Sequence, residues 1–328
     1  MSQWTVSEPD RITLDEAVRA LEVRIIGGAV NVVAAEGPAR LEVTELDGEP
    51  LQVTLTDGVL TVTYPDLSWS DFGDRERFKS VDSVKGILDS LFRKRRARAV
   101  VSLTVPADAE VKVGTVSAEA TVSGVRGGTS VGGVAGSTTL VGLAGRIEAK
   151  SVSGDIDALS VSGDLLVKTV SGGLTVISGT PASLHASTVG GGVTLDLAGT
   201  GSADVRINTV NGDVAVRLPQ PADTTVEAGS TNGQFATAFE ELTVGGSWGA
   251  KKLTGKLGAG TGRLQVTTVS GAISVLRRPE PEDEGPNLVK ELTAPIDEAD
   301  EADEADEAAE QATTGPTDAT DEPKGEQA

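Results

Sequence analysis

The sequence predicts an all-β protein in which short strands stack into a β-solenoid. A phrase of Val-Ser-Gly, one further residue and an aliphatic residue recurs at Val152–Ile156, Val161–Leu165 and Val170–Leu174. Around each phrase apolar residues alternate with polar ones, which is the period of a strand. The region is rich in Gly, Val and Thr and has no sustained helical spacing. A fixed phrase at near-fixed spacing indicates stacked repeats.

Looser copies of the phrase set the size of the repeat. They begin at Val189, Val210, Thr231 and Val269. The first three phrases start nine residues apart, and the later starts at 189, 210 and 231 are 19 to 21 apart. We interpret this as one coil of roughly 20 residues with two sides of about 10. The glycine of the phrase either leaves room for a neighbouring coil or takes a positive φ at a bend.

The N-terminal part predicts a flexible start followed by hairpins. Residues 1–15 are polar and predict a flexible N-terminus, and residues 16–65 predict β hairpins that make the first coils. Gly27-Gly28 separates two runs of alternating aliphatics, and Asp57-Gly58 separates two more. Both dipeptides favour two-residue hairpin turns.

Residues 66–99 interrupt the β pattern with a predicted amphipathic helix. Its apolar stripe, at helical spacing, consists of Phe78, Val81, Val84, Leu88, Leu91 and Phe92. A basic cluster follows at the end where cations suit the helix dipole, namely Arg93, Lys94, Arg95 and Arg96, with Arg98 beyond. Two interpretations stay open: the stripe contacts an anionic membrane or a partner groove, or the helix packs on the β stack with its arginines in solvent.

Residues 100–278 are expected to form the β-repeat solenoid. The rhythm loosens between 239 and 262, where Trp248 appears, and we expect an irregular coil or hairpin that covers the end of the stack. The glycine-rich stretch Gly258–Gly262 invites comparison with phosphate-binding loops. It is not a Walker sequence and no strand–helix unit surrounds it, so we expect no phosphate site there.

Residues 279–328 predict a disordered acidic tail. From Glu280 onward there are 18 acidic residues and two lysines, so the tail carries most of the net charge of −21. Low hydrophobicity and charge of one sign leave little to offset the entropy of ordering. The remaining, repeat-bearing part is only mildly acidic, and its charge by itself indicates no class of partner.

Groups that could perform chemistry are scarce. There is no cysteine and a single histidine, His185, which we expect to be an ordinary surface residue. Asp155, Asp164 and Asp213 recur at one place in the phrase. Carboxylates stacked in this way could bind Ca²⁺ or hydrolyse glycosides, but aspartate after glycine is also common in turns. We therefore predict no catalytic residue, metal site or cofactor.

The repeated Thr-Val-Ser-Gly phrase, together with Leu21–Ile25 and Val30–Val33, resembles a known family. It is similar to the bacterial β-strand-repeat family of proposed adhesins, a domain of unknown function, over Trp4 to about Pro279. The resemblance implies a β-solenoid-like fold and no established activity. No export signal is apparent at the start of the sequence, which argues against surface adhesion.

These observations predict a non-enzymatic β-repeat scaffold or adhesin-like binding protein that acts through partner binding or self-assembly. We expect a protein partner or self-association, peripheral contact with an anionic membrane through the apolar stripe and basic cluster, and no nucleic acid or small-molecule substrate. The expected location is the cytoplasm, at or near the inner face of the membrane. The alternatives are a carbohydrate-active β-helix enzyme and an exported surface adhesin.

Overall fold

The computed structural model describes residues 1–65, 67, 97–199, 202–247 and 250–279. These residues hold 25 strands and no helix, and they belong to one compact unit, so the all-β prediction is confirmed for this part of the chain. Most of the predicted helix, residues 68–96, and the acidic tail from Glu280 lie outside the described residues, as does Trp248.

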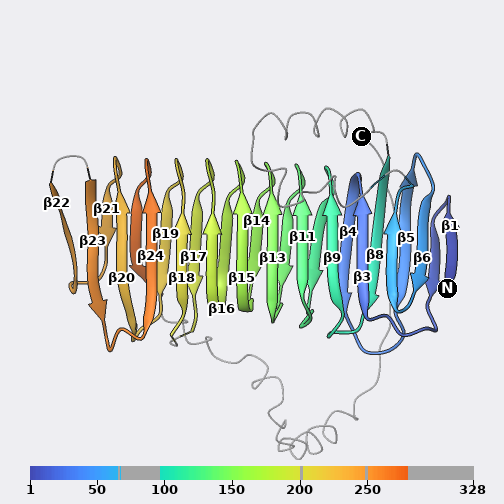
Figure 1. Cartoon of the computed structure of the whole chain (residues 1–328), viewed down its shortest axis with the longest axis horizontal. Coiled ribbons are helices and arrows are strands. Elements are labelled where there is room, and N and C mark those ends of the chain that lie inside the picture. Colours follow the sequence, from blue (N-terminus) through green and yellow to red (C-terminus); the bar gives the residue numbers. More distant parts are fainter. Residues whose placement is uncertain (66, 68–96, 200–201, 248–249, 280–328) are drawn as a thin grey trace, which may run out of the picture. The chain divides into compact units, whose positions relative to one another are not determined.

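Two sheets face each other along the stack, and each central coil contributes one strand to each sheet (Figure 1). Only β16, which spans Leu174–Ser187, takes part in both. Sheet A contains, in spatial order, β1 (Ser2–Val6), β6 (Leu51–Thr56), β7 (Val59–Thr63), β3 (Ala20–Ile25), β9 (Glu110–Thr115), β11 (Thr129–Gly133), β13 (Arg146–Ser151), β15 (Ser162–Thr169), the end of β16, β18 (Asp204–Asn208), β24 (Gly262–Thr268), β20 (Thr224–Ser230), β23 (Ala250–Leu257) and β22 (Leu242–Ser247).

Sheet B lies opposite and repeats the arrangement. It contains, in spatial order, β2 (Asp10–Thr13), β5 (Arg40–Asp47), β8 (Arg98–Val105), β4 (Gly27–Ala34), β10 (Glu119–Ser123), β12 (Thr138–Val141), β14 (Ile156–Leu159), the start of β16, β17 (Val193–Leu197), β19 (Val214–Leu218), β25 (Ile273–Arg277) and β21 (Phe235–Thr237). Central strands are parallel, and antiparallel pairs occur only toward the two ends.

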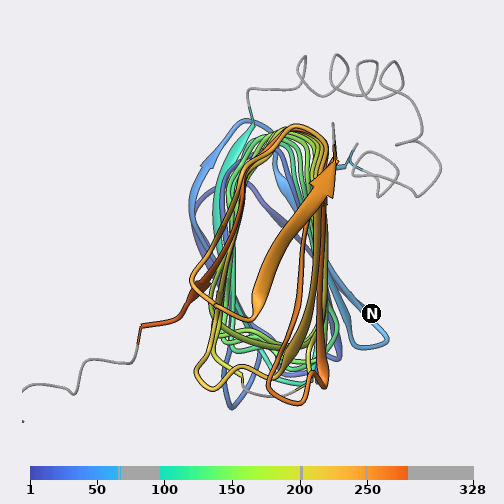
Figure 2. The ribbon, with the colours of Figure 1, turned by 90° about the vertical axis from the view of Figure 1, so that its left-hand side faces the viewer.

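The register gives the length of a coil. In sheet A, Val111 stacks on Thr129, Ile147 and Leu165, so successive coils are 18 residues long. The next coils are 19 and 21 residues long, from Leu165 to Leu184 and on to Val205. The predicted two-sided coil is therefore present. The core is the thin layer of Val, Leu, Ile and Ala between the sheets, seen end-on in Figure 2.

The N-terminal strands differ from two expectations. Residues 1–15 form β1 and β2 instead of a flexible start, because they pair antiparallel with β6 and β5 and complete the edges of both sheets. The prediction of a hairpin at Gly27-Gly28 is wrong, because β3 and β4 lie in different sheets. Strand β4 instead pairs in parallel with β8 and β10. The Asp57-Gly58 hairpin is confirmed between β6 and β7, with φ values of 51° and 75°.

Spatial order departs from chain order at both ends. The coil of β3 and β4 lies between the coil of β7 and β8 and that of β9 and β10. At the other end the last coil of the chain, β24 and β25, is inserted between β18 and β19 on one side and β20 and β21 on the other. The β22–β23 hairpin follows β20, and β22 crosses the end of the stack (Figure 2), which confirms the expected hairpin there.

Candidate interaction surface

Except for the copy at Val161–Leu165, which lies at the opposite corner, the repeated phrase forms the corner at which the chain leaves sheet A and enters sheet B. A buried hydroxyl opens many of these turns: Thr169 Oγ1 accepts a hydrogen bond from the Gly172 N–H at 3.0 Å. The same bond recurs at Ser151–Gly154, Thr188–Gly191, Thr209–Gly212 and Ser230–Gly233, at 2.8, 3.1, 3.0 and 2.8 Å. In these five turns the hydroxyl accepts a backbone N–H that strand pairing does not use, so the five corners share the same hydrogen bond.

The glycine of the phrase is required by close stacking. A Cβ placed on Gly172 would overlap the carbonyl oxygen of Gly154 in the preceding coil. The same overlap recurs in the following coils, where a Cβ would meet the carbonyl oxygen of the stacked glycine in the adjacent coil. The glycines concerned are Gly191, Gly212, Gly271 and Gly233. None of these glycines has a positive φ, so the room that glycine leaves, and not its backbone freedom, explains the residue at this corner.

The valines that open the phrase at this corner occupy the same place as Ile26, Val116 and Val134 of earlier coils. Together these residues form a column, which we call the corner column. Each member's carbonyl accepts a hydrogen bond from the next coil, for example Val170 O from Gly190 N and Val189 O from Asn211 N, at 2.8 and 2.9 Å. Neighbouring members therefore lie about 4.8 Å apart. The members are Ile26, Val116, Val134, Val152, Val170, Val189, Val210 and Val269.

Half of the corner column is an apolar ridge exposed to solvent. Val170, Val189, Val210 and Val269 occupy adjacent coils and are 40%, 48%, 40% and 46% exposed. Exposed aliphatics are ordinary when scattered, but a continuous row of them on one corner is a candidate contact for another apolar surface. Sequence reasoning identified the repeated Val but not its exposure, because strand parity does not extend through a corner.

The three recurrent aspartates do not converge. Asp155 and Asp213 lie at the corner of the phrase, and each accepts a backbone N–H of the next coil, from Gly173 at 2.7 Å and Ala272 at 2.8 Å. Asp164 lies in β15, beyond the opposite corner, and accepts the Ser183 hydroxyl at 2.7 Å. All three connect adjacent coils. Their arrangement suits turn chemistry, not a pair of carboxylates acting on one glycosidic bond.

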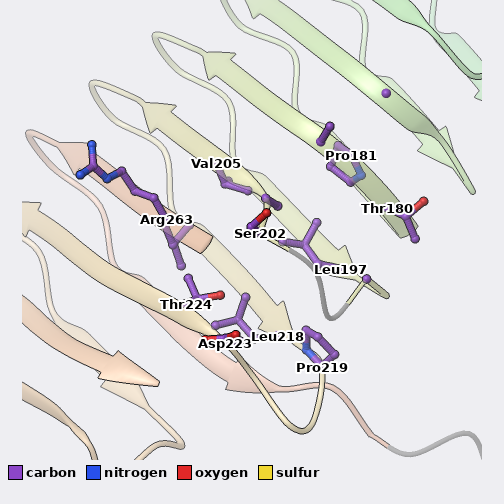
Figure 3. Close-up of a pocket in the computed structure, with 16 residues that line it drawn as sticks. Thr180, Pro181, Leu197, Ser202, Val205, Leu218, Pro219, Asp223, Thr224 and Arg263 are labelled. Atoms are coloured by element: carbon purple, nitrogen blue, oxygen red, sulfur yellow. The ribbon is translucent and has the colours of Figure 1, made fainter. Parts of the chain in front are cut away.

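A cavity of about 390 Å³ opens at the opposite corner, between the coils of β16, β18 and β24 (Figure 3). Its wall combines apolar side chains such as Leu197 and Leu218 with Arg263 and Asp223. The carboxylate of Asp223 accepts the N–H and hydroxyl of Thr261 at 3.2 and 3.0 Å. These bonds, the backbone N–H of Thr261 first, hold the pKa of Asp223 below its ordinary value.

The contacts of Asp223 also explain the glycine-rich stretch Gly258–Gly262. Its backbone N–H groups are turned toward a carboxylate of the protein itself, which takes the position that a bound anion would need. His185 lies partly exposed in β16, between Leu166 and Arg206 of the neighbouring strands.

Other site types find little support in the described ranges. Within them no three His, Cys, Asp or Glu side chains are grouped so that they could hold a metal ion, and no helix is long and apolar enough to cross a membrane. The predicted contact residues, namely the apolar stripe and the basic cluster, lie outside the described part of the chain.

Comparison with known proteins gives one family and one solved structure. The family model Toastrack DUF4097 matches residues 22–276. A crystal structure of a proposed cell adhesion protein from Clostridium sporogenes ATCC 15579 is similar at 13% identity, over 83% of this chain and 100% of that chain. Its TM-score is 0.24, too low to support an inference. No curated protein matches the chain.

Proposed function

We propose that this chain, which belongs to the Toastrack DUF4097 family, is a non-enzymatic β-repeat scaffold that binds a protein partner along its corner. The observation that supports this is the exposed ridge of Val170, Val189, Val210 and Val269. Side chains three and four apart on a helix are about 5–6 Å apart, close to the spacing of the coils. An amphipathic helix laid along the corner is therefore the partner that the ridge fits best.

Removal of the ridge tests this function. Threonine has nearly the shape of valine and suits strands, so V170T/V189T/V210T should keep the fold and weaken the apolar contact. A matched control is V33T/I177T, because Val33 and Ile177 are as exposed, at 48% and 46%, but lie outside the corner column.

The readout is capture from the native cell, followed by measurement of the affinity of each purified partner. We expect the ridge variant to lose a partner that the wild type and the control retain, with an affinity at least about tenfold weaker. The same partners and affinities for all three proteins would refute the proposal. Light scattering on the same samples separates partner binding from self-assembly, since a ridge that joins two copies changes the mass of the pure protein.

The absence of catalysis and the location in the cell belong to the same proposal. If the wild type hydrolysed a polysaccharide and Asp164→Asn lost this activity, the protein would be a carbohydrate-active enzyme and not a scaffold.

For location we propose the cytoplasm, at or near the inner face of the membrane. Protease treatment of intact cells should release no peptides from residues 110–278, and their release would instead support an exported adhesin.

A further inference from the structure

Burial of the corner column changes abruptly along the stack. Ile26, Val116 and Val134 are only 3%, 1% and 8% exposed, whereas every member from Val170 onward is at least 40% exposed. Val152, between the two groups, is partly exposed. The column is thus covered at one end and open at the other.

The turn itself does not explain this difference. The ladder of backbone hydrogen bonds is the same at both ends: Ala135 N donates to Val116 O at 2.8 Å, and Gly190 N donates to Val170 O at 2.8 Å. The residues that follow, such as Ser117 and Ser171, are exposed at both ends. The column loses its exposure while the residues that follow it keep theirs, and we infer from this that a covering group lies against the column near the first coils.

A second column on the outer face of sheet A follows the same trend. Next to the corner, Gly114 is buried and Gly132 and Lys150 are partly exposed. Their equivalents farther along the stack, Lys168, Ser187, Asn208 and Thr267, are all exposed. The covering group therefore lies on the sheet A side of the corner.

The chain leaves and re-enters the described structure at the covered end. Leu67 and Ala97 are 5% and 7% exposed, and they flank the corner between β7 and β8. The carbonyl of Ala97 lies next to Gly27, which follows Ile26 at the first position of the column. The described chain thus resumes, at Ala97, beside the first member of the column.

The length of this segment matches the covered distance. The stripe from Phe78 to Phe92 would span about 21 Å as a helix. From Ile26 to Val152 the column extends over three coil spacings, about 14 Å. The residues before the stripe can reach about 33 Å and the four after it about 13 Å, enough for a helix that returns along the corner toward Ala97.

We propose that residues 68–96 dock by their apolar stripe along the covered end of the corner column, over Ile26, Val116 and Val134. This goes beyond the proposed function, which concerns the open end of the same column. Docking leaves the basic cluster near the coil of β8 and removes the stripe from water, so the stripe is not available to a membrane or a partner.

Cysteine pairs test the contact directly, because the natural chain has no cysteine. With Phe92 near Ile26, Val84 lies about two coil spacings along, opposite Val134. We expect V84C/V134C to form an intramolecular disulfide under mild oxidation. The yield should exceed by at least about fivefold that of S83C/V134C, whose Ser83 is on the polar face, and of V84C/V210C, which is out of reach.

Labelling of a single thiol gives the second test. In the full chain, V134C should react with a maleimide on the order of tenfold more slowly than V210C. V84D/L88D should release the segment and raise the rate of V134C to that of V210C, whereas the polar-face change S83D/S90D should leave it low. Circular dichroism checks that each variant keeps its strands.

Three results would overturn the proposal. Equal disulfide yields for Val84 and Ser83 would exclude a stripe that faces the column. Disulfides formed only between chains would assign the covered end to a second copy. Labelling of V134C that is as fast as that of V210C in the full chain, with or without phosphatidylglycerol-rich vesicles, would show that the stripe does not cover the column. The proposed function is tested at the open end, so either can fail without the other.

Discussion

Glycine in the phrase supports stacking through the space that it leaves. Gly172 is predicted to tolerate no side chain, because a Cβ would overlap the carbonyl of Gly154, and backbone cannot move aside as a flexible side chain can. We expect Gly172→Ala to lower the free energy of unfolding by about 2–3 kcal/mol. Gly173→Ala is the control, since its Cβ would meet its nearest atoms at 3.5 Å. Urea denaturation measures both, and equal losses would refute the stacking argument.

Asp223 should contribute stability that depends on pH. Its pKa is lowered from 3.8, first by the hydrogen bond from the Thr261 N–H. A carboxylate whose folded pKa is depressed stabilises the fold above its unfolded pKa and loses this contribution as pH falls through the folded pKa. Asp223→Asn should therefore be less stable than wild type near neutral pH, and the difference should disappear in acid. Urea midpoints from about pH 6 to pH 2 measure this; a constant difference would contradict it.

Among the elements, the segment between β7 and β8 is expected to make two kinds of contact. If its stripe docks on the corner column, only the basic cluster remains free to contact an anionic surface. Each cation near such a surface contributes about 1 kcal/mol of binding free energy. We expect weak binding to anionic vesicles that falls with added salt and is lost when Arg93, Lys94, Arg95 and Arg96 are all changed to Ala. Cosedimentation measures it. Binding that resists salt, or survives the four changes, would require insertion of apolar residues instead.

For the whole molecule, the inserted coil of β24 and β25 holds the far end of the stack together. Deletion of residues 262–328 removes the parallel neighbours of β20 and β21 and the bond from Arg278 to Ser178. We expect residues 224–257 to lose hydrogen-exchange protection while β9 to β15 keep it, because coils mainly stabilise their immediate neighbours. Deletion of 280–328 alone is the control. Retained protection would mean that β20 pairs with β18 in place of β24.

The sequence by itself determined the β character of the chain after residue 15, the two-sided coil and the recurrence of the phrase, because side-chain alternation and turn residues are local properties of the chain. It also identified the tight hairpin at Asp57-Gly58, whose turn depends on two residues. It did not reveal that Asp155 and Asp164 lie at opposite corners, since that depends on which sheet each strand joins.

Only the tertiary structure decided which strands are neighbours. Gly27-Gly28 resembles a hairpin turn, yet β4 pairs with β8 and β10, and β24 enters between two earlier strands. All coils carry nearly the same apolar pattern, so local sequence does not distinguish one neighbour from another. The exposure of Val170 and the burial of Val116 depend likewise on contacts between distant segments, and the surfaces available for binding follow from them.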